Sequence, residues 1–236
     1  MQANKQTECI ILAGGLGTRL RSAVPDLPKC MAPIAGRPFL AYLLDYLLAQ
    51  QVTKFIFSLG YMHEVIEDFI KSNYPQIQYQ IALESEPLGT GGAIRLACDC
   101  ATEENVIILN GDTMFNVDIQ ALLHLHINSK SDCTLSLKTM HHFDRYGVVQ
   151  TDLNNNITSF KEKKQYETGN INGGVYALNV ASFKSISFPT IFSFEKDYLE
   201  KYFNELKMIG CLFDGYFIDI GIPEDFEKAG RELGNK

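Results

Sequence analysis

The segment from Gly14 to Arg21 combines the backbone and side-chain types that bind phosphate. It reads Gly-Gly-Leu-Gly-Thr-Arg-Leu-Arg and follows the apolar run Cys9–Ala13. Glycines let backbone N–H groups converge on an anion without interference from Cβ atoms. Arginine adds a fixed positive charge whose fork geometry matches phosphate oxygens. We therefore predict that the chain binds a polyphosphate at the end of its first strand.

Other kinds of glycine-rich loop fit this segment less well. A Walker A loop is excluded, because no Gly-Lys-Ser/Thr follows at the right spacing. A dinucleotide-binding turn would share Gly15 and Gly17, but it has a third small residue where this chain has Leu20. In addition, the next predicted strand does not end in an acidic residue that could bind a ribose hydroxyl. A tight turn without a ligand explains the glycines but not the arginines. Both alternatives stay open on this segment alone.

Three further polar clusters follow predicted strands or the loop after the first strand. Lys29 lies in Pro28–Pro33, Asp112 follows Gly111, and Asp219 precedes Ile220-Gly221. In open parallel sheets, ligands bind beyond the carboxyl ends of the strands. Mg²⁺ takes one or two carboxylates and completes its shell with phosphate oxygens and water. Asp112 alone could equally be a turn residue, but the combination predicts a Mg²⁺-bound nucleotide held by Asp112 and Asp219.

Hydrophobic patterning predicts the elements that position these clusters. In the first half, strands alternate with amphipathic helices, which favours right-handed crossovers in a doubly wound sheet. The second half has short strands with turn-like spacers and a hairpin turn at Asp152–Asn156. We predict an α/β fold, a Rossmann-like doubly wound mixed sheet with a small antiparallel extension.

The predicted boundaries are as follows. Strands are expected at Cys9–Ala13, Thr53–Leu59, Ile77–Leu83, Asn105–Leu109, Cys133–Lys138, Gly147–Thr151, Ile157–Lys161, Gly174–Leu178, Met208–Phe213 and Tyr216–Ile220. Helices are expected at Pro38–Gln50, His63–Asn73, Gly91–Cys100 and Phe194–Leu206. We expect a single domain over residues 1–236, with a nucleotide-binding half at about 1–115 and a second half at about 116–236.

Composition excludes several classes of protein. The chain has 236 residues and a formal net charge of −7, which argues against nucleic-acid partners and an anionic membrane surface. Its polar N-terminus lacks a secretory apolar region, and no apolar run approaches a membrane span. The 6 cysteines lack zinc spacing and are expected to be free thiols. We predict a cytoplasmic protein; a homo-oligomer stays an open expectation.

Motifs along almost the whole chain resemble the sugar-1-phosphate nucleotidyltransferases, or nucleotide-sugar pyrophosphorylases. Within that family, the length and Asp144–Gly147 are most similar to the D-glycero-D-manno-heptose 1-phosphate guanylyltransferases. The resemblance implies the fold of the nucleotide-diphospho-sugar transferases, with the second half, about 116–236, as the sugar-binding half. The motifs are Gly14–Leu20, Pro28–Pro33, Glu86–Gly92, Asn110–Asp112, Phe160–Lys163, Asn172–Tyr176, Ser193–Asp197 and Asp219–Asp225.

The resemblance implies transfer of a nucleoside monophosphate from GTP to a sugar 1-phosphate, with pyrophosphate as leaving group and Mg²⁺ as cofactor. It implies catalytic roles for Arg19 at the departing phosphates, Lys29 at the α-phosphate, and Asp112 and Asp219 at the metal. The implied nucleotide-binding residues are Leu12, Ala13, Gly14, Gly15, Gly17, Thr18, Arg19, Glu84, Pro87, Gly89, Thr90 and Gly111. The implied sugar-phosphate-binding residues are Gly147, Glu162, Lys163, Asn172 and Gly173.

Glu84 precedes Pro87 by three residues, in the segment that family members place near the base. Guanine presents two adjacent donors, N1–H and N2–H₂, which a carboxylate can accept, whereas uracil and thymine suit an amide better. We therefore predict that Glu84 selects guanine, with Glu86 as the alternative. The sugar is predicted to be D-glycero-α-D-manno-heptose 1-phosphate; mannose 1-phosphate, or another hexose 1-phosphate with UTP or dTTP, is the alternative.

Some residues in these motifs also have ordinary structural explanations. Lys163 could belong to a solvated charged turn, and Asn172-Gly173 to a turn. Glu195 and Asp197 are expected to be the acidic first turn of a helix. Two other functions stay open: a catalytically silent regulator that binds a nucleotide-sugar, and a metal-dependent glycosyltransferase. Loss of Lys29, Asp112 or Asp219 would favour the regulator, but all three are present. The glycosyltransferase would not need Lys29 or the glycine-rich phosphate loop.

Overall fold

A seven-stranded sheet forms the centre of the protein. The computed structural model describes residues 7–15, 24 and 26–234. All strand pairings in this sheet are parallel except those of β11, which runs antiparallel to β6 and to β8. The spatial order is β12 (Met208–Leu212), β8 (Cys133–Phe143), β11 (Tyr166–Asn179), β6 (Asn105–Asn110), β1 (Glu8–Leu12), β4 (Lys54–Leu59) and β5 (Gln78–Leu83).

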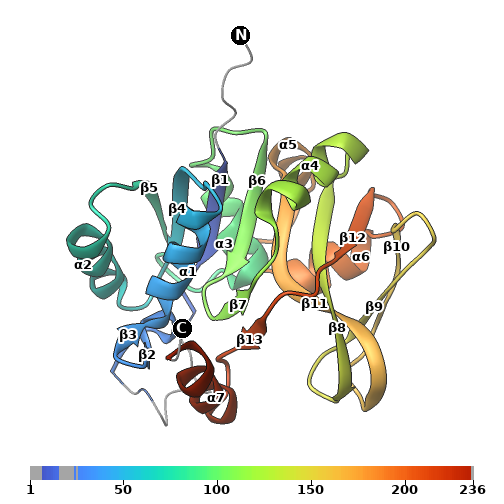
Figure 1. Ribbon diagram of the computed structural model, residues 1–236. Helices are drawn as coiled ribbons and strands as arrows, with labels where there is room; N and C mark the ends of the chain where they lie inside the picture. The colour runs from blue at the N-terminus through green and yellow to red at the C-terminus, as the bar shows by residue number, and fades with distance from the viewer. Residues whose placement is uncertain (1–6, 16–23, 25, 235–236) are drawn as a thin grey trace.

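Helices cover both faces of the sheet (Figure 1). One face packs against α1 (Phe39–Ala49), α2 (His63–Asn73) and α4 (Ile119–Ser129). The other packs against α3 (Gly89–Cys98), α5 (Val180–Ser185) and the π-helix η2 (Phe194–Leu199), which continues into α6 (Glu200–Tyr202). Successive side chains of a strand point to opposite faces, so Cys9 and Ile11 enter the first core and Ile10 the second. This explains why the central strands read as uninterrupted apolar runs.

Smaller elements surround the edge of the sheet where the site lies. The short helix η1 (Lys29–Met31) precedes the hairpin of β2 (Pro33–Ile34) and β3 (Arg37–Pro38). Strand β9 (Val148–Thr151) pairs with β10 (Ile157–Lys161), and β7 (Thr113–Phe115) pairs with β13 (Phe217–Asp219). Helix α7 (Pro223–Leu233) follows β13. The predicted antiparallel extension is confirmed by the β9–β10 hairpin.

The turn of that hairpin forms as predicted. Asp152 Oδ1 accepts hydrogen bonds from the backbone N–H groups of Asn154 and Asn156, both at 2.8 Å. The strand that carries Asp219 lies outside the main sheet, although the sequence analysis grouped Asp219 with the strand ends of an open parallel sheet. It reaches the same edge through β7, which continues the chain just beyond β6.

Several boundaries also differ from the prediction. Strand β11 is far longer than Gly174–Leu178, because its first part pairs with an extended β8 across a stretch that has no alternating pattern. The predicted helix Phe194–Leu206 is a π-helix followed by a short α-helix that ends at Tyr202. Helix α4 was not predicted, although Asp118 caps it by accepting a hydrogen bond from the Ala121 N–H at 2.8 Å.

Two sequence-level expectations concern the whole chain. All the cysteines are free thiols, as predicted. Among the helices of the described residues, none combines the length and the apolar character that a membrane crossing requires.

Candidate active site

The first of two adjoining cavities lies where β1, β4 and β6 end and α3 begins. We name it the glycine-lined cavity; its volume is about 510 Å³. Gly17, Thr18 and Arg19 lie outside the residues that the structure describes. The predicted nucleotide-binding residues that line it are Leu12, Ala13, Gly14, Gly15, Glu84, Pro87, Gly89, Thr90 and Gly111.

Close backbone approach explains two of these glycines. The Gly111 N–H donates to the Leu12 carbonyl oxygen at 2.9 Å, and a Cβ at Gly111 would lie 2.6 Å from that oxygen. Gly89 has a φ of +72°, and its Cβ would lie 2.5 Å from the Phe192 carbonyl oxygen. Any side chain at either position would force main-chain segments apart. The wall of the cavity is therefore built largely from packed backbone.

Glu84 contributes a carboxylate to this cavity. Its Oε2 accepts a hydrogen bond from the Leu88 N–H at 3.0 Å, and its Oε1 lies 3.4 Å from the hydroxyl of Ser58. A carboxylate has about four lone-pair positions, so acceptor capacity is left over. Glu86 is exposed and is absent from the described lining of both cavities. The geometry thus favours Glu84 over Glu86 as a base-contacting residue.

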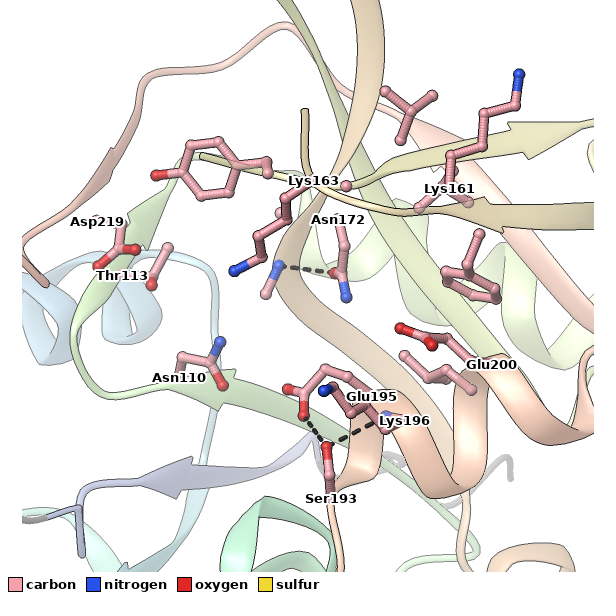
Figure 2. Close-up of a pocket in the computed structure, with 18 of the residues that line it drawn as sticks. Asn110, Thr113, Lys161, Lys163, Asn172, Ser193, Glu195, Lys196, Glu200 and Asp219 are labelled. Carbon is pink, nitrogen blue, oxygen red and sulfur yellow. Dashed lines mark hydrogen bonds between the residues drawn. The ribbon is translucent and has the colours of Figure 1, made fainter. Parts of the chain in front are cut away.

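The second cavity, named the charged cavity, has a volume of about 700 Å³. Figure 2 shows Asp219 at one end and Glu200 at the other, with Lys163 and Asn172 between them. Lys163 turns its ammonium group toward the Asp219 side, whereas Lys161 points away. The structure places all the predicted sugar-phosphate-binding residues here: Gly147, Glu162, Lys163, Asn172 and Gly173.

Asn172 is held in place by an irregularity in β11. The pairing register with β8 shifts between Asn172 and Tyr176, next to Gly174 with a φ of +75°. Asn172 Nδ2 donates to the Tyr176 hydroxyl at 2.9 Å, and Asn172 Oδ1 accepts from the Gly174 N–H at 3.0 Å. Bulges of this kind re-aim side chains beside active sites. Asn172 and Gly173 therefore belong to a strand rather than to a turn.

The two cavities meet at a cluster of one cation and two carboxylates. Asn110, Asp112 and Glu195 line both cavities. Lys29 Nζ contacts Asp112 Oδ2 directly and lies 3.9 Å from Asp219 Oδ1. Lys29 is well buried, with a side-chain exposure of 13%. The polyphosphate side and the sugar side thus share one charged centre.

The electrostatics of this centre fit a divalent cation. Burial raises the pKa of Asp219, the charge of Asp112 raises it further, and Lys29 opposes both effects. Two close carboxylates with a cation between them match the donor set that Mg²⁺ uses together with phosphate oxygens. The described residues contain no cluster of three or more acidic, histidine or cysteine ligands. A metal bound here would therefore depend on substrate phosphates for further ligands.

Cys30, beside Lys29, lines the glycine-lined cavity. It is 3% exposed, and burial together with the charge of Asp112 raises its pKa to about 12. The thiol therefore stays protonated at neutral pH. It adds no charge beside Lys29.

Glu195 is a site residue that the sequence reasoning missed. Its Oε2 accepts hydrogen bonds from the Thr90 hydroxyl at 2.7 Å and the Ser193 hydroxyl at 3.0 Å. It therefore joins the rim of the glycine-lined cavity to the charged cavity. Its neighbour Asp197 has the predicted helix-start role, since its carboxylate accepts from the Ser193 N–H at 2.8 Å.

Other missed lining residues are Asn110, Thr113, Lys196 and Glu200. Asn110 and Thr113 flank the Gly111-Asp112 motif, so their position beside that motif could have identified them from the sequence. Lys196 lies within the Ser193–Asp197 motif. Glu200 lies in no motif, and its position depends on how the helix is wound.

Comparisons with known proteins agree with this geometry. A model of the Nucleotidyl transferase family matches residues 8–236. The chain is 52% identical over 226 residues to the D-glycero-alpha-D-manno-heptose 1-phosphate guanylyltransferase of Aneurinibacillus thermoaerophilus, a match that covers 96% of this chain and 98% of that protein. It is 43% identical to the enzyme of the same name from Campylobacter jejuni, over 93% of this chain and 96% of that one.

A solved structure is similar over nearly the whole chain. It is the crystal structure of HddC from Yersinia pseudotuberculosis complexed with GMP-PN, with a TM-score of 0.87 and 38% identity. The match covers 97% of this chain and 100% of that chain. The predicted fold class and the predicted family resemblance are confirmed. The chain belongs to the nucleotidyl transferase family and is a nucleotidyltransferase.

Proposed function

We propose that this protein transfers GMP from GTP to D-glycero-α-D-manno-heptose 1-phosphate, giving the GDP-heptose and pyrophosphate. The observation that carries the proposal is the meeting of the two cavities at Lys29, Asp112 and Asp219. A nucleotide in one cavity and a sugar 1-phosphate in the other would bring their phosphates together there. The guanylyltransferase relatives support guanine and heptose as the two partners.

The reaction needs positioning and charge neutralisation. A phosphate oxygen of the sugar 1-phosphate attacks the α-phosphorus of GTP, the bond from that phosphorus to the bridging oxygen breaks, and pyrophosphate leaves. The attacking oxygen is already anionic, so no general base is required. Lys29 would stabilise the negative charge that develops at the α-phosphate. The backbone of Gly14 and Gly15 would hold the triphosphate.

The predicted roles of Gly17, Thr18 and Arg19 concern residues that the structure does not describe, and they remain part of this proposal. Arg19 would hold the departing β- and γ-phosphates. Asp112 and Asp219 would hold Mg²⁺, which when bound supplies positive charge to the phosphates and raises the electrophilicity of the α-phosphorus. Because Lys29 lies between these carboxylates, it would have to move toward the phosphates for a metal to bind both.

The substrate-binding residues follow from the same arrangement. Glu84 would accept the two hydrogen bonds of the guanine edge, while Leu88 keeps its carboxylate in place. Lys163 would bind the phosphate of the sugar, because its ammonium group turns toward the Asp219 end. Glu162 and Asn172 would bind sugar hydroxyls, and Gly147 and Gly173 would leave room for the ring. GTP is a cytoplasmic metabolite, so the reaction also favours the predicted cytoplasmic location.

One substrate panel tests the proposal. Purified protein with Mg²⁺ is given GTP, ATP, UTP or dTTP, each with heptose, mannose or glucose 1-phosphate, and pyrophosphate release is measured. We expect the highest kcat/KM with GTP and heptose 1-phosphate. Highest activity with mannose 1-phosphate would replace the heptose assignment. Release of pyrophosphate in no combination would refute the enzymatic proposal and favour a silent binder of nucleotide-sugars.

A further inference from the structure

The end of the charged cavity that lies away from the aspartates carries groups that the phosphate chemistry does not use. Figure 2 places Asp219 at one end and Glu200 at the opposite end, beyond Lys163 and Asn172. The proposed reaction takes place at the Asp219 end. With the phosphate at the Asp219 end, the groups at the Glu200 end would face the part of the sugar that lies away from its phosphate.

The π-helix η2 brings Glu200 into the cavity wall. In a π-helix, hydrogen bonds join residues five apart, so residues four and five apart share one side. Glu195 lines the charged cavity, and so do Leu199 and Glu200, four and five residues later. In an α-helix a residue five positions on would point roughly 140° away. Phe194 and Tyr198 occupy the other side of η2 and are fully buried, which fixes the orientation.

The Glu200 carboxylate has unused acceptor capacity. Within the described part of the chain, no hydrogen bond or ion pair engages it, and Figure 2 shows it pointing into the cavity. Burial raises the pKa of Glu200, as does the nearby charge of Glu162, while Lys196 opposes them. A carboxylate placed beside a second carboxylate at a cavity wall, without a partner of its own, is poised to accept hydrogen bonds from ligand hydroxyls.

An aromatic side chain completes this end of the cavity. Phe160 lines the cavity, and its ring centroid lies 5.7 Å from that of Phe203, three residues after Glu200. Leu199 also lines the cavity but is fully buried, so the partly exposed ring of Phe160 supplies the apolar contact at this end. An apolar wall next to an acceptor suits a short carbon chain that carries hydroxyls, because the C–H groups pack on the wall while the hydroxyls donate.

We propose that Glu200 binds the C6–C7 glycol of the heptose and thereby selects a seven-carbon over a six-carbon sugar 1-phosphate. This inference rests on the proposed function. Mannose 1-phosphate also carries a hydroxyl at C6, but it lacks C7 and the hydroxyl that C7 carries in heptose 1-phosphate. Its terminal hydroxyl lies farther from the anomeric phosphate than any ring hydroxyl does. With the phosphate at Lys163, the glycol extends toward Glu200.

The test compares two sugars and three variants. Glu200→Gln keeps the size of the side chain and Glu200→Ala removes it; Glu205→Gln is the matched control, an exposed glutamate of the same segment outside the cavity lining. For both Glu200 variants, kcat/KM with heptose 1-phosphate should fall about 10- to 100-fold, mainly through KM. With mannose 1-phosphate it should change less than about twofold, as the ring contacts are intact. Calorimetry should give the same loss of affinity for GDP-heptose but not for GDP-mannose.

The outcomes separate this inference from the proposed function. If wild-type protein uses heptose 1-phosphate and both Glu200 variants keep its preference over mannose 1-phosphate, the inference is wrong and the proposed function stands. An equal loss with both sugars would make Glu200 a structural residue and would also overturn the inference. If wild-type protein uses neither sugar, the proposed function fails, and the inference fails with it.

Discussion

The glycine-lined cavity and the charged cavity are built by different means. The first is walled by main chain that packs against main chain, as at Gly111 and Gly89. The second is walled by charged side chains such as Lys163, Glu162 and Glu200, which come from separate elements. Backbone N–H groups suit phosphates, which every nucleotide shares. Side chains suit a sugar, whose identity lies in the positions of its hydroxyls. The common part of the reaction is therefore held by backbone and the variable part by side chains.

Asp219 is expected to give the largest effect, because it lies where the two cavities meet. Asp219→Asn keeps the size of the side chain but removes the charge, and we expect kcat to fall about 1,000-fold. Stability should not fall, because burial and Asp112 already disfavour the ionised form of Asp219. Pyrophosphate release and thermal melting measure the two quantities. Asp214→Asn is the control, since Asp214 is an exposed carboxylate bonded only to Lys138 among the described residues. Near-normal turnover of Asp219→Asn would contradict the metal-binding role.

Glu84 tests whether the glycine-lined cavity has one side chain that reads its ligand. Glu84→Gln keeps an acceptor for the Leu88 N–H but presents a donor to guanine. We expect the preference for GTP over UTP to fall about 100-fold, because a site built on hydrogen bonds discriminates strongly only while they are paired. The ratio of kcat/KM values measures this. Glu86→Gln should leave the ratio unchanged. An unchanged ratio in Glu84→Gln would show that Glu84 only holds the backbone at Leu88 in place and does not select the base.

The two cavities also differ in how much the sequence alone could predict. Gly14, Gly15, Gly111 and Asp112 follow buried apolar strands directly, so strand prediction also placed them at one edge of the sheet. An acidic residue such as Glu195 is typical of the first turn of a helix. Nothing in the local sequence distinguishes that role from a place in the cavity wall. Packing of buried aromatic rings against the sheet accompanies the π-helix that turns Glu200 inward. Local sequence therefore predicted these residues of the backbone-built site, and the family resemblance predicted five residues of the charged cavity. Tertiary packing decided the positions of Glu195 and Glu200, which the sequence did not predict.

Lys163 tests the side-chain character of the charged cavity. Lys163→Ala removes one exposed ammonium group, so the fold should be unaffected. We expect KM for the sugar 1-phosphate to rise about 10- to 30-fold, since a charge-assisted bond to phosphate is lost. KM for GTP should stay the same. Lys164→Ala is the matched control, because Lys164 lies outside the cavity lining and over the ring of Tyr166. An equal rise in both KM values would place Lys163 between the substrates.

Gly111 tests the opposite property of the glycine-lined cavity. In Gly111→Ala the added carbon would lie 2.6 Å from the Leu12 carbonyl oxygen and 3.3 Å from Ala13 Cβ. The ends of β1 and β6 would have to separate, at a cost of about 1–2 kcal/mol in the free energy of unfolding. Chemical denaturation measures this cost. Gly15→Ala is the control, because none of the residues that the structure describes lies within 4 Å of the carbon it adds. Equal stability of both variants would show that the backbone contact is not tight.

His126, on α4, bridges two strands of the main sheet, β6 and β8. Its ring bonds Asn105 Oδ1 of β6 at 3.1 Å and Thr134 Oγ1 of β8 at 3.0 Å. Burial lowers its pKa to about 4, while the nearby charge of Asp132 opposes the shift. The unfolded chain takes up a proton near pH 6.5, so between about pH 6.5 and 4 protonation favours the unfolded state. The contribution of the neutral His126 ring to the stability of the fold is therefore fully present above about pH 6.5.

We therefore expect the free energy of unfolding to fall by about 1 kcal/mol between pH 7 and pH 5.5 on account of His126. Urea unfolding of the wild type and of His126→Gln at both pH values measures it. The variant should be less stable at pH 7, because it disturbs a buried pair of hydrogen bonds, but its stability should fall less on acidification. His141→Gln changes an exposed histidine, so its free energy of unfolding should depend on pH as that of the wild type does. If the stability of His126→Gln falls as steeply on acidification as that of the wild type, His126 is not the group that causes the pH dependence.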